Sequence, residues 1–389
     1  MKFFAPAWVF LALFSACSSR VPSSEGGIHR GFEKVKIGRF QSRALFRPAD
    51  VKLFGDRAPV VIMLPGSGPN GPEEAMPGTT TVDGQDSFLF LRYAEALTKA
   101  GFNALLVGKP GVEYHSGWGE GSRFYNAEMY EKLKWQDLID NARDAMEWAQ
   151  TDKRVHPDRV WVLGHSEGTQ VAVDFATTLV PLEGLILLGF SGEDLKTTLE
   201  WQLVERQIEW FVSRDVDKDH DGFITREEAA AWPEASFPFR EGEKRVSVAR
   251  TREAVRAMPE IKAMIEKFAQ KPLYGYGVFD RGSQYVKAAL VPPAIYAFTG
   301  ELDVQTPARE AKKLASTCKE EGKSICHVKI WPGVGHAFSP PKSPRAQPFL
   351  DLTLGPPAPE FLDALTTTMR EALGTPSVNV PGPAPENWD

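Results

Sequence analysis

A serine lies between two glycines in the stretch Gly-His-Ser-Glu-Gly at residues 164–168. A serine hydroxyl becomes a useful nucleophile only when a base lies within hydrogen-bond reach and a third group orients that base. The apolar run 160–163 precedes the stretch and a helical pattern follows it, which predicts a sharp strand-to-helix turn. Ser166 is therefore the candidate nucleophile, and the alternative is a hydroxyl in an ordinary tight turn.

An acid and a histidine follow Ser166 in the chain order that a Ser-acid-His triad requires on such a turn. Asp303 comes just after the apolar run 294–298, and Glu301 is the competing acid. A helix-capping role is the other interpretation of Asp303. Of the seven histidines, His336 alone follows a predicted strand in a glycine-rich loop beyond the acid, whereas His165 is expected to pack beside the turn.

Acyl transfer also needs N–H groups that bind the oxyanion of the tetrahedral intermediate. The backbone N–H of Glu167 is one predicted donor. The glycine-rich loop after the apolar run 59–64 supplies the second, at Ser67 or alternatively at Gly66. Because no Gly-Lys-Ser/Thr follows, this loop is not predicted to bind phosphate.

A second chemical motif occupies residues 217–228, Asp-Lys-Asp-His-Asp-Gly-Phe-Ile-Thr-Arg-Glu-Glu. Acids at positions 1, 3 and 5, glycine at 6 and glutamate at 12 match the calcium loop of an EF-hand. The alternative is an acidic, solvated turn. The predicted calcium ligands are Asp217, Asp219, Asp221, the carbonyl of Phe223, Thr225 and Glu228.

Such loops usually come in pairs, and Ile224 at position 8 would pair with a second loop. The full pattern is recognised once, so the partner is expected to be an irregular site or another chain. Extracellular modules bind calcium weakly, which favours a structural role over a switch. No cofactor is expected for catalysis.

The elements that must position these residues alternate along the chain. Residues 32–54 suggest a hairpin, and the apolar runs that predict further strands are 59–64, 102–107, 160–163, 185–188, 294–298 and 328–331. Helical patterns between them cover 87–100, 135–149, 171–179 and 307–320. This alternation predicts an α/β fold with a mostly parallel central sheet and helices on both faces. In such a sheet the functional loops lie at the carboxyl ends of the strands.

The strand series is interrupted at residues 191–290, where 195–212 and 251–268 have amphipathic helical spacing. We expect a mainly helical lid there, carrying the loop 217–228. The other predicted parts are a signal peptide at 1–16, a linker at 17–30, the two parts of the core at 31–190 and 291–373, and a proline-rich tail at 374–389.

The motifs and their order resemble the α/β-hydrolase family over residues 58–190 and 290–340. The glycine-rich loop after 59–64 is similar to that of a bacterial esterase and serine-peptidase-like branch. Members of that branch often have Asp-Lys-Arg-Gly where this chain has Gly-Lys-Pro-Gly at 108–111. The resemblance implies the α/β-hydrolase fold and acyl transfer to water: Ser166 attacks a carbonyl, His336 relays the proton and Asp303 holds the imidazole.

The N-terminus predicts export. Lys2 and the short apolar stretch 3–14 are typical of a secretory signal and too short for a membrane span. Cys17 resembles the lipidated cysteine of a bacterial lipoprotein; the alternative is an ordinary cleavage beside a cysteine. A lipid there would anchor the protein to a membrane, in the periplasm or on the outer membrane. Export also permits a disulfide between Cys318 and Cys326, whose geometry the sequence leaves open.

The charge composition indicates which kinds of binding partner to expect. The formal net charge is -6 over 389 residues and there is no long basic run, so nucleic acid is not expected. The sequence predicts a serine hydrolase of small-molecule esters or other acyl substrates. A peptidase or acyltransferase on the same fold is one alternative, and a non-catalytic, calcium-dependent surface-binding lipoprotein is another. The oligomeric state is left open.

Overall fold

A computed structural model describes residues 29–50, 53–80, 86–115, 125–233, 235–275, 277–340 and 356–374. The predicted signal peptide, Cys17, nearly all of the predicted linker and nearly all of the predicted tail lie outside these residues. Within them, none of the helices combines the length and the apolar character that crossing a bilayer demands.

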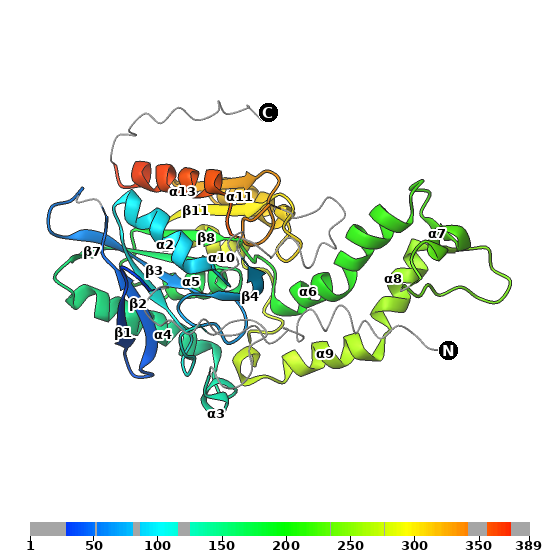
Figure 1. Cartoon of the computed structure of the whole chain (residues 1–389), viewed down its shortest axis with the longest axis horizontal. Helices are drawn as coiled ribbons and strands as arrows, with labels where there is room; N and C mark the ends of the chain where they lie inside the picture. Colours follow the sequence, from blue (N-terminus) through cyan, green and yellow to red (C-terminus); the bar gives the residue numbers. More distant parts are fainter. Residues whose placement is uncertain are drawn as a thin grey trace.

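An eight-stranded sheet forms the centre of the molecule, in the order β1-β2-β6-β3-β7-β8-β11-β12 (Figure 1). β2 runs antiparallel to both of its neighbours, and every pair from β6 to β12 is parallel. This strand order is that of the α/β-hydrolase fold, as predicted. The strands are β1 (Glu33–Ile37), β2 (Ser42–Arg47), β3 (Ala58–Leu64), β6 (Asn103–Val107), β7 (Val155–His165), β8 (Gly184–Leu188), β11 (Ala294–Gly300) and β12 (Cys326–Trp331).

Helices cover both faces of the sheet, which explains why its central strands are apolar without alternation, whereas the edge strands β1 and β12 carry exposed charged residues. β3 is buried along its whole length. Val60 and Ile62 pack on one face with α4 (Trp135–Thr151), α5 (Glu167–Ala176), α10 (Tyr285–Leu290) and α11 (Ala308–Glu320). Val61 and Met63 pack on the other with α2 (Leu89–Ala100) and α13 (Pro359–Ala372).

Smaller features complete the core. β4 (Ala75–Thr80) and β5 (Asp86–Phe88) form a two-stranded sheet, and α3 (Ala127–Tyr130) is a single turn. A disulfide joins Cys318 on α11 to Cys326 at the start of β12, with 6.4 Å between the Cα atoms. It ties the edge strand of the sheet to the helix that precedes it.

A helical arm extends from the core, with α7 and α8 at its far end (Figure 1). The outgoing side is α6 (Leu195–Glu200) followed by the π-helical segments η2 (Trp201–Glu205) and η3 (Ile208–Val216). α7 (Arg226–Ala230) and α8 (Val248–Arg256) follow, with β9 (Phe223–Thr225) paired to β10 (Arg245–Ser247). α9 (Pro259–Ala269) and the 3-10 turn η4 (Pro272–Tyr274) return to the core.

The single helix predicted over 251–268 is two helices. α8 ends at Arg256 and α9 begins at Pro259. Proline lacks an N–H and its ring clashes with the preceding turn, so it starts a helix and does not continue one. α10, within the range predicted as lid, packs in the main core through Tyr285 and Ala288.

Candidate active site

Ser166 lies on the turn between β7 and α5. Its φ of 54° and ψ of -122° are uncommon for a residue with a side chain. A Cβ on Gly164 would lie 2.2 Å from the Gly168 carbonyl oxygen, and one on Gly168 would lie 2.2 Å from that of Leu64. Glycine is therefore required at both positions, because β3, β7 and α5 approach so closely. The turn presents the Ser166 side chain at the carboxyl end of the sheet.

Asp303 and His336 meet at the same edge, after β11 and β12. The Nδ1 of His336 lies 2.8 Å from Oδ2 of Asp303, and both side chains are buried. Thr306 donates its hydroxyl to that Oδ2 at 2.9 Å, and the N–H groups of Gln305 and Thr306 donate to Oδ1. These bonds fix the carboxylate against the imidazole. With Nδ1 donating to Asp303, Nε2 is the nitrogen left to accept a proton.

His336 and Ser166 lie beside each other around the end of β8. Ser166 N–H donates to the carbonyl of Leu188, the last residue of β8. The next residue, Gly189, faces the His336 ring, since a Cβ there would lie 3.0 Å from Cε1. The structure thus joins Asp303 to His336, and it places both His336 and Ser166 next to the end of β8. Glu301, the competing acid, is exposed and its carboxylate accepts from Gly333 N–H.

In the glycine-rich loop after β3, the predicted oxyanion donors are the N–H groups of Ser67 and, alternatively, Gly66. Gly66 N–H donates to Oε1 of Glu74 at 2.8 Å and is therefore engaged. Ser67 lines the same pocket as Ser166, and the Asn70 amide holds the carbonyls of Gly66 and Ser67. Glu167 is the first residue of α5, where helix N–H groups can bind an anion, and its role as an oxyanion donor stays a prediction.

Glu74 is a site residue that the sequence analysis missed. Its Oε1 also lies 2.8 Å from Nδ1 of His165, whose Nε2 is 3.2 Å from the carbonyl oxygen of His336. Burial lowers the pKa of His165, but the Glu74 carboxylate, the His336 carbonyl and Asp303 together outweigh burial, so the pKa is raised overall. His165, expected only to pack, links the oxyanion loop to the loop of His336. Local sequence held no signal for this pair, since its members are 91 residues apart.

The carboxylate of Glu167 has a cation on one oxygen and a hydroxyl donor on the other. Lys109 Nζ lies 2.6 Å from Oε1, and the Tyr274 hydroxyl donates to Oε2 at 2.5 Å. Burial raises the pKa of Tyr274, and the adjacent Glu167 raises it further. Lys109 belongs to the stretch 108–111 that departs from the esterase-like pattern. In this chain its role is to pair with the residue after the nucleophile.

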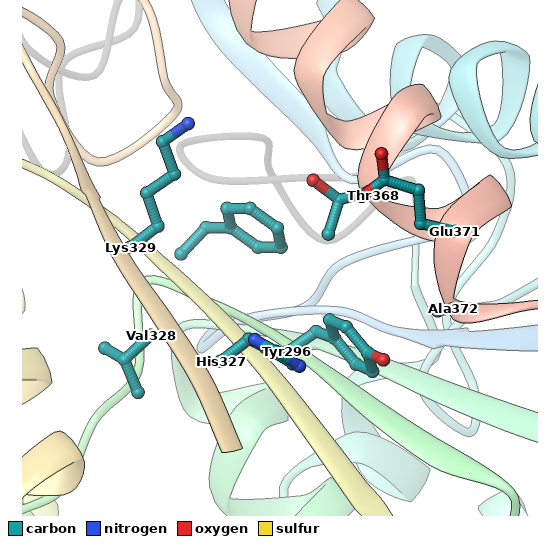
Figure 2. Close-up of a pocket in the computed structure, with 8 residues that line it drawn as sticks. Tyr296, His327, Val328, Lys329, Thr368, Glu371 and Ala372 are labelled. Carbon is teal, nitrogen blue, oxygen red and sulfur yellow. The ribbon is translucent and has the colours of Figure 1, made fainter. Parts of the chain in front are cut away.

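The pocket at Ser166 has a volume of about 70 Å³, and the base of the arm forms one wall of it. The wall residues come from α6 and α9 and are Leu195, Thr198, Leu199 and Phe268. A larger cavity of about 550 Å³ lies elsewhere, between β11, β12 and α13. Figure 2 shows Lys329 on one side of it and Thr368 and Glu371 on the other. We place the chemistry at the smaller pocket, because Ser166 lines it.

The acidic loop in the arm is folded so that its oxygens converge. One ligand atom each from Asp217, Asp219 and Glu228 lies within 4.8 Å of the others. The Asp217 side chain is buried, and its Oδ1 has no hydrogen-bond partner among the described residues. Asp221 N–H, Phe223 N–H and Gly222 N–H donate to carboxylates within the loop. This donor set suits a hard, oxygen-seeking cation.

The loop has a partner within the same chain. β9 lies within the loop, at positions 7 to 9, and pairs antiparallel with β10, so that Ile224 lies opposite Val246. The two side chains are buried in a separate cluster with Ile208, Val212, Val216 and Val248. The sequence analysis left the partner open between an irregular site and another chain. The partner is an irregular segment of this chain that contains β10. A strand of three residues is too short to be recognised from its sequence pattern.

No protein-family model matches the chain, and no curated protein sequence matches it. Solved structures do match. They include Est1E from Butyrivibrio proteoclasticus (11% identity, TM-score 0.43, 89% of this chain and 100% of that one) and proline iminopeptidase from Mycobacterium smegmatis (13%, 0.48, 88% and 98%). A thermostable carboxyl esterase from Bacillus coagulans also matches (16%, 0.39, 78% and 90%). Sequence identities this low say nothing about which reaction the chain catalyses. The activity is therefore inferred from the geometry of the candidate site.

Proposed function

We propose that the chain is a serine hydrolase that cleaves carboxylic esters through Ser166, His336 and Asp303. The observation that carries the proposal is the buried 2.8 Å contact between His336 Nδ1 and Asp303 Oδ2, beside a serine on a strained turn. The small volume of the pocket favours short acyl groups. The same triad and pocket could act on esters or on amides. The experiment below therefore also tests for peptidase and acyltransferase activity.

In the first half-reaction, Ser166 Oγ attacks the carbonyl carbon and its proton passes to Nε2 of His336. The oxyanion accepts hydrogen bonds from the N–H groups of Glu167 and Ser67. His336 then gives the proton to the departing alkoxide, which leaves an ester on Ser166. In the second, water attacks this ester, His336 takes the water's proton and returns it to Ser166, and the carboxylic acid is released.

The test combines labelling with turnover. A fluorophosphonate probe is expected to modify Ser166, and a short p-nitrophenyl ester to be hydrolysed; Ser166→Ala should lose both. A panel of short and long esters, amides and acyl acceptors then assigns the substrate class. A folded wild-type protein that neither reacts with the probe nor turns over any substrate would favour the non-catalytic lipoprotein instead.

We also propose that residues 217–228 bind calcium and stabilise the arm. Asp217, Asp219, Asp221, Thr225, Glu228 and the Phe223 carbonyl would hold the ion, which supplies charge neutralisation in the loop. The partnerless buried oxygen of Asp217 supports this assignment. Calcium is expected to raise the melting temperature of the wild type and to have no such effect on Glu228→Gln.

Finally, we propose that the protein is exported and anchored by a lipid on Cys17, in the periplasm or on the outer membrane. The support is the N-terminal sequence alone, since Cys17 lies outside the described residues. Expression with a radiolabelled fatty acid should label the wild type and leave Cys17→Ser unlabelled. Label on both proteins would exclude this anchor.

A further inference from the structure

Two imidazoles and a carboxylate meet at the loop between β3 and β4. His29 precedes β1, Glu73 lies between β3 and β4, and His115 follows β6. One ligand atom of each lies within 4.8 Å of the others, and His29 Nε2 is 2.6 Å from Oε1 of Glu73. The side chains of His29 and Glu73 are buried. Three distant parts of the chain thus bring their donor atoms to one point.

The arrangement is more than a histidine–glutamate ion pair. Glu73 Oε2 accepts the backbone N–H of His115 at 3.1 Å, which fixes the carboxylate and leaves Oε1 facing His29. The rings of His29 and His115 are stacked, with centroids 4.9 Å apart and planes 23° apart. An ion pair uses one imidazole, and stacked imidazoles cannot both be charged without repulsion. A shared divalent cation accommodates two neutral imidazoles and the carboxylate together.

We propose that His29, Glu73 and His115 bind a zinc-like divalent metal ion, with water in the fourth position. Nitrogen and carboxylate ligands in this ratio suit Zn²⁺, whereas Ca²⁺ prefers about six to eight oxygens. Binding displaces the proton between His29 Nε2 and Glu73 Oε1 to solvent. Tyr114 and Phe88 contact the two imidazoles with their rings and shield the site.

The position of the site connects it to the proposed chemistry without placing metal in the reaction. Glu73 immediately precedes Glu74, whose carboxylate holds Gly66 N–H and His165. A metal on Glu73 would therefore hold the oxyanion loop against the segment before β1. The ion is a structural support in this proposal, and its binding is measurable whether or not the protein hydrolyses esters.

Chelator-treated full-length protein should bind one equivalent of ZnCl₂ in calorimetry, and Co²⁺ should give visible d–d absorption. His29→Ala and His115→Ala are each expected to weaken Zn²⁺ binding by at least about tenfold. His156→Ala, a histidine that contacts the Asp158 N–H on β7, is the matched control and should bind normally. Glu73→Gln, which keeps an acceptor for His115 N–H, serves if a histidine variant misfolds. Absence of Zn²⁺ binding, or unchanged binding in the folded His and Glu73 variants, would overturn the proposal.

A second inference, which builds on the proposed calcium loop, concerns its partner. The register of Ile224 opposite Val246 aligns residues 239–250 with 217–228, position by position. Position 5 is then Glu243, and position 12, which is Glu228 in the first loop, is Arg250. The Arg250 guanidinium donates to both carboxylate oxygens of Glu243 and to the carbonyl of Pro238.

We infer that Arg250 takes the place of a cation in the second loop, so that the pair binds one calcium ion. The first loop has the carboxylate of Glu228 at position 12 and therefore needs a metal cation. The second loop has the guanidinium of Arg250 at that position, which is itself a cation. Glu243 also accepts the N–H of Arg240, which closes the loop around the guanidinium. The hydrogen bonds of β10 to β9 are therefore available before any metal binds.

Calorimetry with CaCl₂ should give one equivalent for the wild type, and two would overturn this inference. Arg250→Ala should weaken calcium binding several-fold and lower the melting temperature of the arm. Arg252→Ala, which removes an ion pair with Glu205 outside the loop, should leave calcium binding unchanged. If the wild type binds no calcium, only the proposal of a calcium site at 217–228 fails. The melting temperature of Arg250→Ala then still tests whether the Arg250 guanidinium stabilises the second loop. An unchanged melting temperature would overturn that role of Arg250.

Discussion

The backbone at Ser166 costs free energy that the rest of the fold must supply. A non-glycine residue held at positive φ costs about 1–3 kcal/mol. The Ser166 N–H bond to Leu188 and the tight contact of Gly168 with Leu64 hold the turn in place. Strain of this kind persists where the surrounding packing determines the backbone, and here it lies at the proposed nucleophile.

The assignment of Asp303 as the acid of the triad can be tested at its contact with Nδ1 of His336. Asp303→Asn should lower kcat for a short ester by about 10³–10⁴-fold, because the amide no longer selects the tautomer in which Nδ1 of His336 carries the proton. Glu301→Gln is the matched control, since its carboxylate contacts Gly333 and lies exposed. Steady-state kinetics on both variants decide the matter. Loss of activity in Glu301→Gln with Asp303→Asn active would reverse the assignment.

A buried carboxyl near the base of the arm gives a pH prediction. Burial, with a smaller contribution from the nearby Glu193 and Asp303 carboxylates, raises the pKa of Glu310 from its ordinary 4.5 to about 8, against the hydrogen bond from Gly192 N–H. The folded state therefore binds a proton that the unfolded state releases above about pH 4.5. The stability that Glu310 contributes is present below pH 4.5 and falls as the pH rises toward 8.

Glu310→Gln stays neutral at every pH and keeps an oxygen for the Gly192 N–H. Relative to the wild type, this variant should gain free energy of unfolding between about pH 5 and pH 8.5, on the order of a few kcal/mol. Urea unfolding at the two pH values measures the difference. An equal difference at both values would show that Glu310 does not change its charge in that range.

The positions of Ser166, Asp303 and His336 could be predicted because each follows a strand with a recognisable apolar pattern. β7 ends in a buried run and β11 is buried, whereas β12 is a partly exposed edge strand. Thr306 was also within reach, as a hydroxyl three residues after Asp303 in a turn. Glu74 and Lys109 were not, since their roles depend on partners 91 and 58 residues away. Contacts of that kind are set by tertiary packing, on which a local pattern carries no information.

At the scale of elements, apolar runs predicted the central parallel strands of the sheet, because a strand buried on both faces cannot alternate. The parallel edge strand β12 alternates, with His327 and Lys329 exposed, and its pattern covered only part of its length. Helix continuity was predicted less well. The break at Pro259 follows from proline chemistry and was recoverable, whereas β9 and β10 are three residues each and had no pattern long enough to detect. Their pairing depends on the apolar cluster around Ile224, which forms only when the arm folds.

The disulfide between α11 and β12 should contribute to stability. It closes a loop with a sequence separation of 8, and the chain-entropy relation assigns roughly 2–3 kcal/mol to a loop of this length. The double variant Cys318→Ser, Cys326→Ser should therefore unfold at lower urea concentration. Treating the wild type with a reductant should reproduce the shift, and treating the variant should change nothing. Equal stability of variant and oxidised wild type would contradict the expectation.

At the scale of the whole molecule, the apolar residues form separate clusters and not one core. Two lie on opposite faces of the sheet, one at the base of the arm around Leu199 and Ile261, and one at its far end around Ile224. The pocket at Ser166 uses the basal cluster through Leu195, Leu199 and Phe268. The acidic loop belongs to the distal cluster, which is far from the sheet in Figure 1.

This separation predicts that calcium acts on the arm locally. Removing it should open the distal cluster and expose arginine and lysine side chains between residues 214 and 256 to trypsin, while the core resists cleavage. Turnover of a short ester should stay within about twofold, because the basal cluster and the triad remain folded. Timed proteolysis with mass spectrometry, run beside an ester assay with and without chelator, measures both. If activity instead falls in step with cleavage, the distal and basal clusters unfold as one unit, and the loop then controls the wall of the pocket.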